Sequence, residues 1–178
     1  MLDWIKEYAA VLTLFVTIVG GGFGGGIALY QWGKQISIRR TEFAYQIIKQ
    51  LRNNKEIAAT HYLIEYGEFH YTEAFHNNHD LEQKIDELLS VLNYACYLLK
   101  SRAIGKRDFS IFRYEVVWIL RNRDLQAYLW NLHHWSKSNQ SPCSFQFLVD
   151  YGLREKLFPT DFISTECKSF ISRQYLNF

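Results

Sequence analysis

Three histidines and an aspartate lie close together in the first half of the chain, and their side chains could bind a metal ion. They are His70, His76, His79 and Asp80. Adjacent His and Asp residues supply paired ligands in helical metal-dependent phosphohydrolases, and imidazole and carboxylate groups suit divalent metals. The further His and Asp patterns of such an enzyme are not found around them, and the segment is typical of a polar loop between helices. We therefore expect no metal and no cofactor, and a phosphohydrolase is the least favoured alternative.

The densest basic segment surrounds a turn between two expected helices in the middle of the chain. Its members are Lys100, Arg102, Lys106, Arg107 and Arg113, with Asp108 as the one acid among them. Guanidinium groups and the N-terminus of a following helix both favour an anion. The alternative is solvated charge at helix ends, which is the more common case. The segment predicts a candidate site for an anionic ligand.

A second candidate is the string His133-His134-Trp135, which Lys137 follows. Consecutive helical residues point about 100° apart, so these two histidines cannot chelate one metal ion from a regular helix. They could instead hydrogen-bond or stack against a base or a phosphate. The pattern favours the alternative of an amphipathic helix end, with Trp135 packed and the histidines near the negative end of the helix dipole. His133, His134 and Lys137 remain candidate ligand residues.

Signatures of common catalytic families are missing from the sequence. It contains no G-x-x-x-x-G-K-[ST], G-x-G-x-x-G, H-E-x-x-H or G-x-S-x-G. The cysteines Cys96, Cys143 and Cys167 are widely spaced and form no C-x-x-C, so they suggest neither a zinc site nor a redox pair. An odd number of unpaired thiols fits a reducing cytosol. We expect a protein that is not an enzyme.

The charge is nearly balanced, with 20 Lys and Arg against 18 Asp and Glu and a net charge of +2. This excess is too small to indicate a protein that binds long nucleic acids. Aromatic residues make up 17% of the chain and only two prolines occur, which argues against disorder. The segment 34–178 is long enough for one domain with a core of its own.

The elements that must position these residues all have helical spacing. The clearest apolar stripe is Leu81, Ile85, Leu88, Leu92, Ala95 and Leu99, with Asp80 and Gln83 as a capping box and Gly105 at its end. A second stripe is Phe109, Phe112, Val116, Ile119 and Leu120, with Asp108 as its cap, and a third is Leu125, Tyr128, Leu129 and Leu132. No strand alternation is present.

Shorter helices are expected on either side of these three. Phe43, Ile47, Ile48 and Leu51 continue the N-terminal helix, and Ile57, His61 and Ile64 mark a short helix after Asn53-Asn54. His61 is expected in the core with one partner. Ser141-Pro142 predicts a helix start, Pro159 an end, and Thr160 the start of a last helix. The sequence thus predicts an all-α bundle of about six helices after the N-terminal one.

The N-terminal helix has the composition of a membrane anchor. Residues 8–33 contain no charged side chain. As a helix they would extend over about 39 Å, against a hydrocarbon core of about 30 Å. Tyr30 and Trp32 suit the membrane interface, and the acidic start with Asp3 and Glu7 is unlike a cleaved signal peptide. We expect residues 1–33 to form a tail and one transmembrane helix, and residues 34–178 a cytosolic domain.

The charges that flank the anchor predict its orientation. Lys6 is the only base before residues 8–33, whereas Lys34, Arg39 and Arg40 follow them. The positive-inside rule then places the N-terminus outside the inner (cytoplasmic) membrane and the large C-terminal part in the cytoplasm.

The centre of the anchor is a run of glycines interrupted by one phenylalanine. The glycines are Gly20, Gly21, Gly22, Gly24, Gly25 and Gly26, around Phe23. They form three overlapping G-x-x-x-G pairs, and such pairs let neighbouring membrane helices approach closely. Together they cover more of the helix than a single dimer interface needs. The run predicts a homo-oligomer, although glycine is also generally frequent in membrane helices.

The order of these features resembles that of small bacterial membrane proteins with a helical cytosolic domain. The resemblance rests on the glycine-rich span, Arg39-Arg40-x-x-x-Ala44-x-x-Ile47-Ile48-x-x-Leu51, Leu88-Leu89-Ser90-Val91-Leu92-Asn93-Tyr94, Gly105 and Asp108-Phe109-x-x-Phe112. Some such proteins are accessory effectors of antiviral CRISPR systems that sense cyclic oligoadenylate and then disturb the membrane. The resemblance implies a cyclic oligoadenylate ligand and a role in antiviral defence.

The sequence therefore predicts a non-enzymatic, membrane-anchored effector that binds a small anionic signal and acts through an oligomeric glycine-rich helix. The main alternative is a membrane-tethered protein-interaction module without a small ligand.

Overall fold

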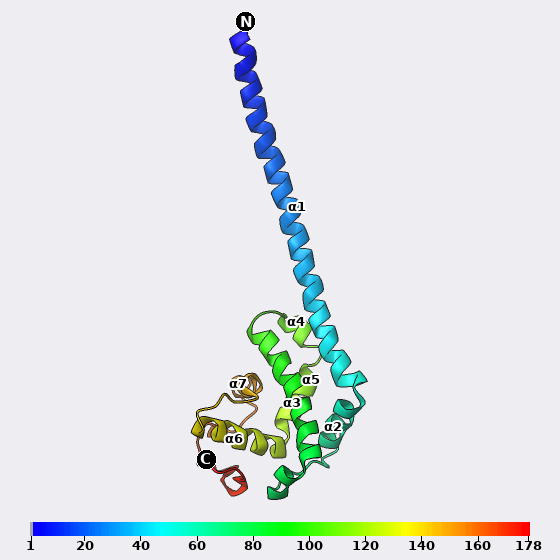
Figure 1. The fold of residues 1–178 in the computed structure, drawn as a ribbon, viewed down its shortest axis with the longest axis vertical. Coiled ribbons are helices and arrows are strands. Elements are labelled where there is room, and N and C mark those ends of the chain that lie inside the picture. Colours follow the sequence, from blue (N-terminus) through cyan, green and yellow to red (C-terminus); the bar gives the residue numbers. More distant parts are fainter. Residues whose placement is uncertain (1) are drawn as a thin grey trace. The chain divides into compact units, whose positions relative to one another are not determined.

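The computed structural model describes the backbone of residues 2–178 and the side chains of residues 8, 9, 13 and 27–178. Every regular element in this part is a helix, with seven α-helices and two 3-10 helices (Figure 1). The predicted all-α class is confirmed. The chain divides into two units, Met1–Thr41 and Glu42–Phe178.

The first helix, α1 (Leu2–Asn53), runs without interruption through the glycine-rich segment. Leu29, Tyr30 and Trp32 are exposed on it. Among the residues that the structure describes, no helix combines the length and the apolar character needed to cross a membrane. Most side chains of the expected span 8–33 lie outside the described residues, and so does the packing expected around its glycines. The transmembrane span therefore stays a prediction.

The unit Glu42–Phe178 is a bundle in which six α-helices follow the end of α1. In chain order its further elements are α2 (Lys55–Glu65), η1 (Glu73–Asn77), α3 (His79–Lys100), α4 (Lys106–Phe109), α5 (Arg113–Arg121), α6 (Arg123–Ser138), α7 (Gln146–Arg154) and η2 (Ile171–Arg173). Helix α3 contacts α2, α4, α7 and η1, and α5 contacts α2 and α6 (Figure 1).

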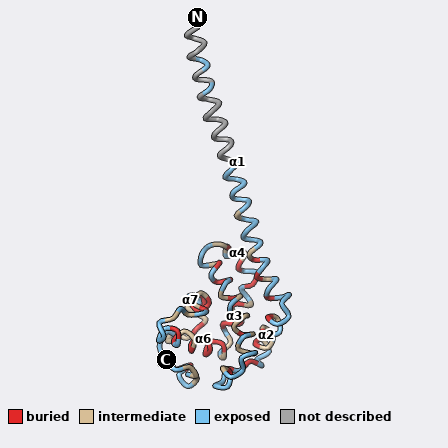
Figure 2. The backbone as a smooth tube through the Cα atoms, in the orientation of Figure 1, coloured by how far each residue is buried: buried red, intermediate tan, exposed pale blue. Residues whose placement is uncertain are grey.

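The apolar stripe of α3 forms the centre of the core. Ile85, Leu88, Leu92 and Ala95 are fully buried, as predicted from their spacing, and they recur once per turn on the face toward the neighbouring helices. The buried positions of the unit lie inside the bundle and the exposed ones on its outside (Figure 2). Trp130 of α6 is also completely buried, whereas Trp118 of α5 is 39% exposed.

The start of α3 differs from the predicted capping box. Asn78 is the N-cap, and its side-chain oxygen accepts a hydrogen bond from the backbone N–H of Leu81 at 3.3 Å. Asp80 lies inside the first turn and pairs with Lys84 at 2.6 Å. Both residues carry an acceptor suited to capping, so local chemistry alone did not decide between them.

Gly105 and Asp108 have roles different from the predicted ones. Helix α3 already ends at Lys100, and Gly105 is the N-cap of α4. Asp108 is in the first turn of α4, where its carboxylate accepts the backbone N–H of Gly105 at 2.9 Å. The stripe that begins at Phe109 is buried as predicted, but it is divided between α4 and α5 by a turn at Phe112.

The last part of the chain is less regular than the sequence predicts. Helix α7 begins at Gln146 rather than Pro142, and it ends at Arg154. No helix begins at Thr160 in the described structure, where turns lead instead to the short η2. Asp161 stabilises these turns, because its carboxylate accepts the backbone N–H of Lys168 at 2.9 Å. The short helix predicted after Asn53-Asn54 is confirmed as α2, which Asn54 caps.

Candidate functional site

The basic turn comprises Lys100, Arg102, Lys106, Arg107 and Arg113, and it lies between α3 and α5. Arg102 has a left-handed backbone conformation, with φ 61°, which reverses the chain after α3. The N–H of Ile104 then donates to the carbonyl of Leu98 at 3.2 Å, and the buried Ile104 side chain fixes the turn to the core. Arg102, Lys106 and Arg107 are exposed on this turn, and within residues 27–178 none of them forms an ion pair.

The two outer bases of the turn are already paired with carboxylates of α7 and the residue that follows it. Lys100 donates to Asp150 at 2.7 Å, and Arg113 donates to Glu155 at 3.3 Å. Burial alone would raise the pKa of Asp150, but the hydrogen bonds from Lys100 and Gln146 lower it below its usual value. The structure therefore divides the five predicted residues into three free bases and two bases that connect the turn to α7.

His134 belongs to the core of the bundle. Its side chain lies beside the rings of Trp130 and Phe178, and its Nε2 is 3.2 Å from the carbonyl oxygen of Phe162. Burial lowers its pKa. The interpretation as an amphipathic helix end, which the sequence favoured, agrees with this position, although Trp135 is 41% exposed rather than packed.

His133 and Lys137 lie closer to solvent on the same helix. His133 is half-buried, its Nδ1 has no hydrogen-bond partner among the described residues, and burial lowers its pKa. The charge of Asp150 raises the pKa of His133 and so opposes the effect of burial. Lys137 is exposed. The second predicted segment thus contains one buried histidine, one half-buried histidine and one exposed lysine.

The histidines around residue 76 do not form a metal site. His76 is held between two side chains, with Nε2 2.9 Å from the Tyr71 hydroxyl and Nδ1 2.7 Å from the Glu82 carboxylate. His70 and His79 are exposed. Across the part of the chain that the structure describes, no three His, Cys, Asp or Glu side chains are arranged to hold a metal ion.

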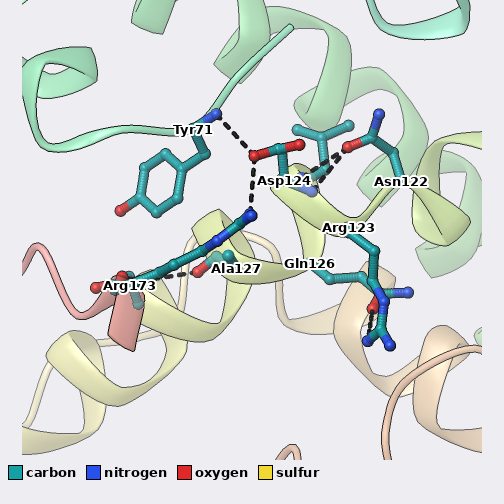
Figure 3. Close-up of polar contacts among 9 residues, drawn as sticks. Tyr71, Asn122, Arg123, Asp124, Gln126, Ala127 and Arg173 are labelled. Carbon is teal, nitrogen blue, oxygen red and sulfur yellow. Dashed lines mark hydrogen bonds and ion pairs between the residues drawn. The ribbon is translucent and has the colours of Figure 1, made fainter. Parts of the chain in front are cut away.

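A polar cluster around Asp124 connects three distant segments of the chain (Figure 3). The Asp124 carboxylate accepts the backbone N–H of Tyr71 at 3.1 Å and the guanidinium of Arg173 at 2.8 Å (Figure 3). Asn122 caps the same end of α6 by accepting the N–H groups of Asp124 and Leu125. The cluster has a structural role, since all the hydrogen bonds it makes are internal to the bundle.

A cavity of about 530 Å³ lies between the end of α1, α2 and α5, within the unit Glu42–Phe178. Arg52, His61, Glu65 and Glu115 line it together with apolar and aromatic residues. His61 is only partly buried, and its Nδ1 is 3.7 Å from the Glu65 carboxylate, so it has an ion-pair neighbour rather than the hydrogen-bonded core partner that was predicted. The sequence did not point to Glu115 or to a cavity here, because these residues lie on helices that are far apart in the chain.

Two polar atoms of this cavity lack partners. His61 Nε2 and Glu115 Oε2 are both shielded from solvent, and neither has a hydrogen-bond partner in the described structure. The other carboxylate oxygen of Glu115 is 3.5 Å from the largely exposed guanidinium of Arg52. An unsatisfied buried polar group costs about 1–3 kcal/mol, so each atom would gain from a ligand that hydrogen-bonds to it.

A second cavity, of about 620 Å³, lies along α3 and is lined by the carboxylates of Glu82, Asp86 and Glu87. Asp86 accepts a hydrogen bond from the Tyr128 hydroxyl at 2.7 Å. Burial raises the pKa of Asp86, although this hydrogen bond opposes the effect. Glu82 is bound by His76, and Glu87 accepts a hydrogen bond from the side chain of Gln83 at 3.2 Å, so all three carboxylates have partners from the protein itself.

Comparison with known proteins gives no relative from which a function could be transferred. No protein-family model, no curated protein and no solved structure matches the chain. The functional conclusion therefore depends on the residues and the geometry described above.

Proposed function

We propose that this protein is a non-enzymatic, membrane-anchored effector whose helical domain binds a small anionic signal at the basic turn. The observation that carries the proposal is the exposure of three free bases, Arg102, Lys106 and Arg107, on a turn fixed to the core. The turn backbone is already held by Ile104 and need not be ordered when a phosphate binds, and guanidinium groups can bind a phosphate through two hydrogen bonds at once.

The proposed signal is a cyclic oligoadenylate, which the resemblance described from the sequence implies. Its phosphates would contact Arg102 and Arg107, with Lys106 and Lys137 adding longer-range attraction. The proposed response passes to a glycine-rich membrane helix that assembles with copies of itself, in a role in antiviral defence. Support for the anchor comes from the uncharged run 8–33 and the bases after it.

The second candidate function is a membrane-tethered protein-interaction module without a small ligand. It is favoured by two exposed, stacked aromatic pairs: Tyr62 of α2 with Tyr66 directly after that helix, and Tyr114 with Trp118 on α5. Exposed aromatic residues are enriched in protein interfaces. A metal-dependent phosphohydrolase is less favoured, since His76 is already bound by Tyr71 and Glu82.

Calorimetric titration of the full chain in detergent with cyclic oligoadenylates tests the proposal. The double variant Arg102→Asn, Arg107→Ala removes two free bases, and Asn tolerates the left-handed backbone at residue 102. Each lost charged hydrogen bond should weaken binding by about 1.5–3 kcal/mol, which is at least about tenfold in affinity.

The matched control is Arg121→Ala with Lys168→Ala, which removes the same charge from exposed positions elsewhere on the bundle. Its affinity should stay within about twofold of the parent value, because long-range attraction is screened by salt. Equal weakening in both double variants, or a folded parent that binds no cyclic oligonucleotide, would contradict the proposal and leave the interaction module as the better account.

A further inference from the structure

We infer that the cavity between the end of α1, α2 and α5 is a binding site for an organic cation, the ammonium or guanidinium group of a small amine or of a basic side chain. This site is separate from the proposed anion site, and it involves different residues. Its lining includes Arg52, His61, Glu65 and Glu115, and its volume of about 530 Å³ is within the range of small-molecule sites.

The two unpartnered atoms define the hydrogen bonds that a ligand would make. Glu115 Oε2 is an acceptor, since an ionised carboxylate has no hydrogen to donate. His61 Nδ1 lies 3.7 Å from the Glu65 carboxylate, and the unpartnered Nε2 of the same ring is the second position open to a ligand. The vacant position on Glu115 requires a donor, and ammonium and guanidinium groups have several.

The charges around the cavity favour a cation over an anion. The single guanidinium of Arg52 only partly balances the two carboxylates of Glu65 and Glu115, so the lining has an excess of negative charge. That guanidinium is 66% exposed and lies 3.5 Å from Glu115, so the existing ion pair is weak. A cation that entered the cavity would replace a weak, solvated partner of Glu115 with a sheltered one.

The aromatic residues at the cavity add to the attraction. Tyr62 and Tyr114 both line it, and their side chains are 54% and 59% exposed. The face of a tyrosine ring attracts ammonium and guanidinium groups. A bare metal ion is a poorer fit, because within the described residues no set of three ligand side chains is grouped to hold one.

Calorimetry on the full chain with three probes tests the site: spermidine, agmatine and a blocked peptide with one arginine. Glu115→Gln keeps the size of the side chain and removes its charge, and it should weaken binding by about tenfold or more. Glu73→Gln, on the exposed surface of η1, is the matched control and should bind as the parent does. Binding of only the free amines identifies a small-molecule ligand, and binding of only the peptide identifies a protein side chain.

Arg52→Gln gives a prediction of opposite sign and does not disturb the core, because the Arg52 side chain is mostly in solvent. Removal of the competing guanidinium should tighten cation binding by about twofold to fivefold, as expected for the loss of an exposed ion pair. If Glu115→Gln does not fold, this variant alone decides. Absence of binding for all three probes on the folded parent, equal affinity in Glu115→Gln, or unchanged or weaker binding in Arg52→Gln would overturn the inference.

Discussion

His133 and His134 are neighbours in the sequence, yet their surroundings differ. His134 is buried beside Trp130, whereas His133 is only half-buried at the edge of the core. Burial lowers the pKa of both imidazoles, so both stay neutral in the folded chain at pH values where the unfolded chain begins to bind protons. Below about pH 6.5 the unfolded state therefore binds more protons than the folded state, and the free energy of unfolding falls as the pH falls.

Replacement of His133 by leucine should reduce this pH dependence. The variant removes one of the two histidines and also removes the unpartnered Nδ1, so stability at neutral pH should be equal or slightly higher. Urea titrations at about pH 7.5 and about pH 5.5 should show a smaller loss of stability for His133→Leu than for the parent. His70→Leu, at an exposed position, is the control and should lose stability as the parent does. A loss in His133→Leu equal to that of the parent would show that His133 does not contribute.

Helix α6 is the element on which the distant parts of the bundle depend most. The Asp124 carboxylate at its start binds the loop before η1 through Tyr71 and the η2 segment through Arg173. Asn131, about two turns further along α6, donates a hydrogen bond to the carbonyl of Arg173 and accepts one from the N–H of Tyr175. These bonds are part-buried, and they join segments that are far apart in the sequence.

Asp124→Ala should therefore destabilise the bundle by about 1.5–3 kcal/mol, since it leaves the Tyr71 N–H and the Arg173 guanidinium without their acceptor. Asp80→Ala is a useful comparison, because it removes only an exposed, solvent-screened pair with Lys84 and should cost much less. The free energy of unfolding from urea titration, monitored by circular dichroism, gives both values. Similar costs for the two variants would mean that the cluster around Asp124 does not hold the segments together.

The existence of the main helices could be predicted from the sequence, whereas several of their ends could not. The apolar residues from Leu81 to Leu99 repeat with the helical period, and this local spacing is enough to predict both the helix and its buried face. The choice of Asn78 over Asp80 as the cap depends on how the chain leaves η1, which is a tertiary constraint. The left-handed turn at Arg102, which ends α3 well before Gly105, has no glycine to mark it.

Prediction of the candidate sites from the sequence was likewise limited to residues that are close together in the chain. The basic turn was visible because its residues are close in the sequence. The pairing of Lys100 with Asp150 and the approach of Glu115 to His61 were not visible, because each joins helices that are far apart in the chain.

At the scale of the whole molecule, the central claim is that ligand binding and membrane assembly belong to different parts of one chain. The basic turn lies in the unit Glu42–Phe178, and the glycine run lies in the unit Met1–Thr41. In the proposed effector, the unit Glu42–Phe178 receives the signal and the unit Met1–Thr41 assembles in the bilayer. A substitution in the glycine run should then affect assembly without affecting the binding site.

The measurement that tests this claim most directly combines crosslinking and ligand titration on the same detergent preparation of the parent and of Gly24→Leu. A leucine at this position would fill the space into which a neighbouring helix is proposed to approach, and overpacking typically costs about 1–3 kcal/mol. We predict that the parent crosslinks as an oligomer and binds cyclic oligoadenylate, whereas Gly24→Leu binds it with the same affinity and is largely monomeric. Assembly of Gly24→Leu like that of the parent, or absence of ligand binding in both, would contradict the account.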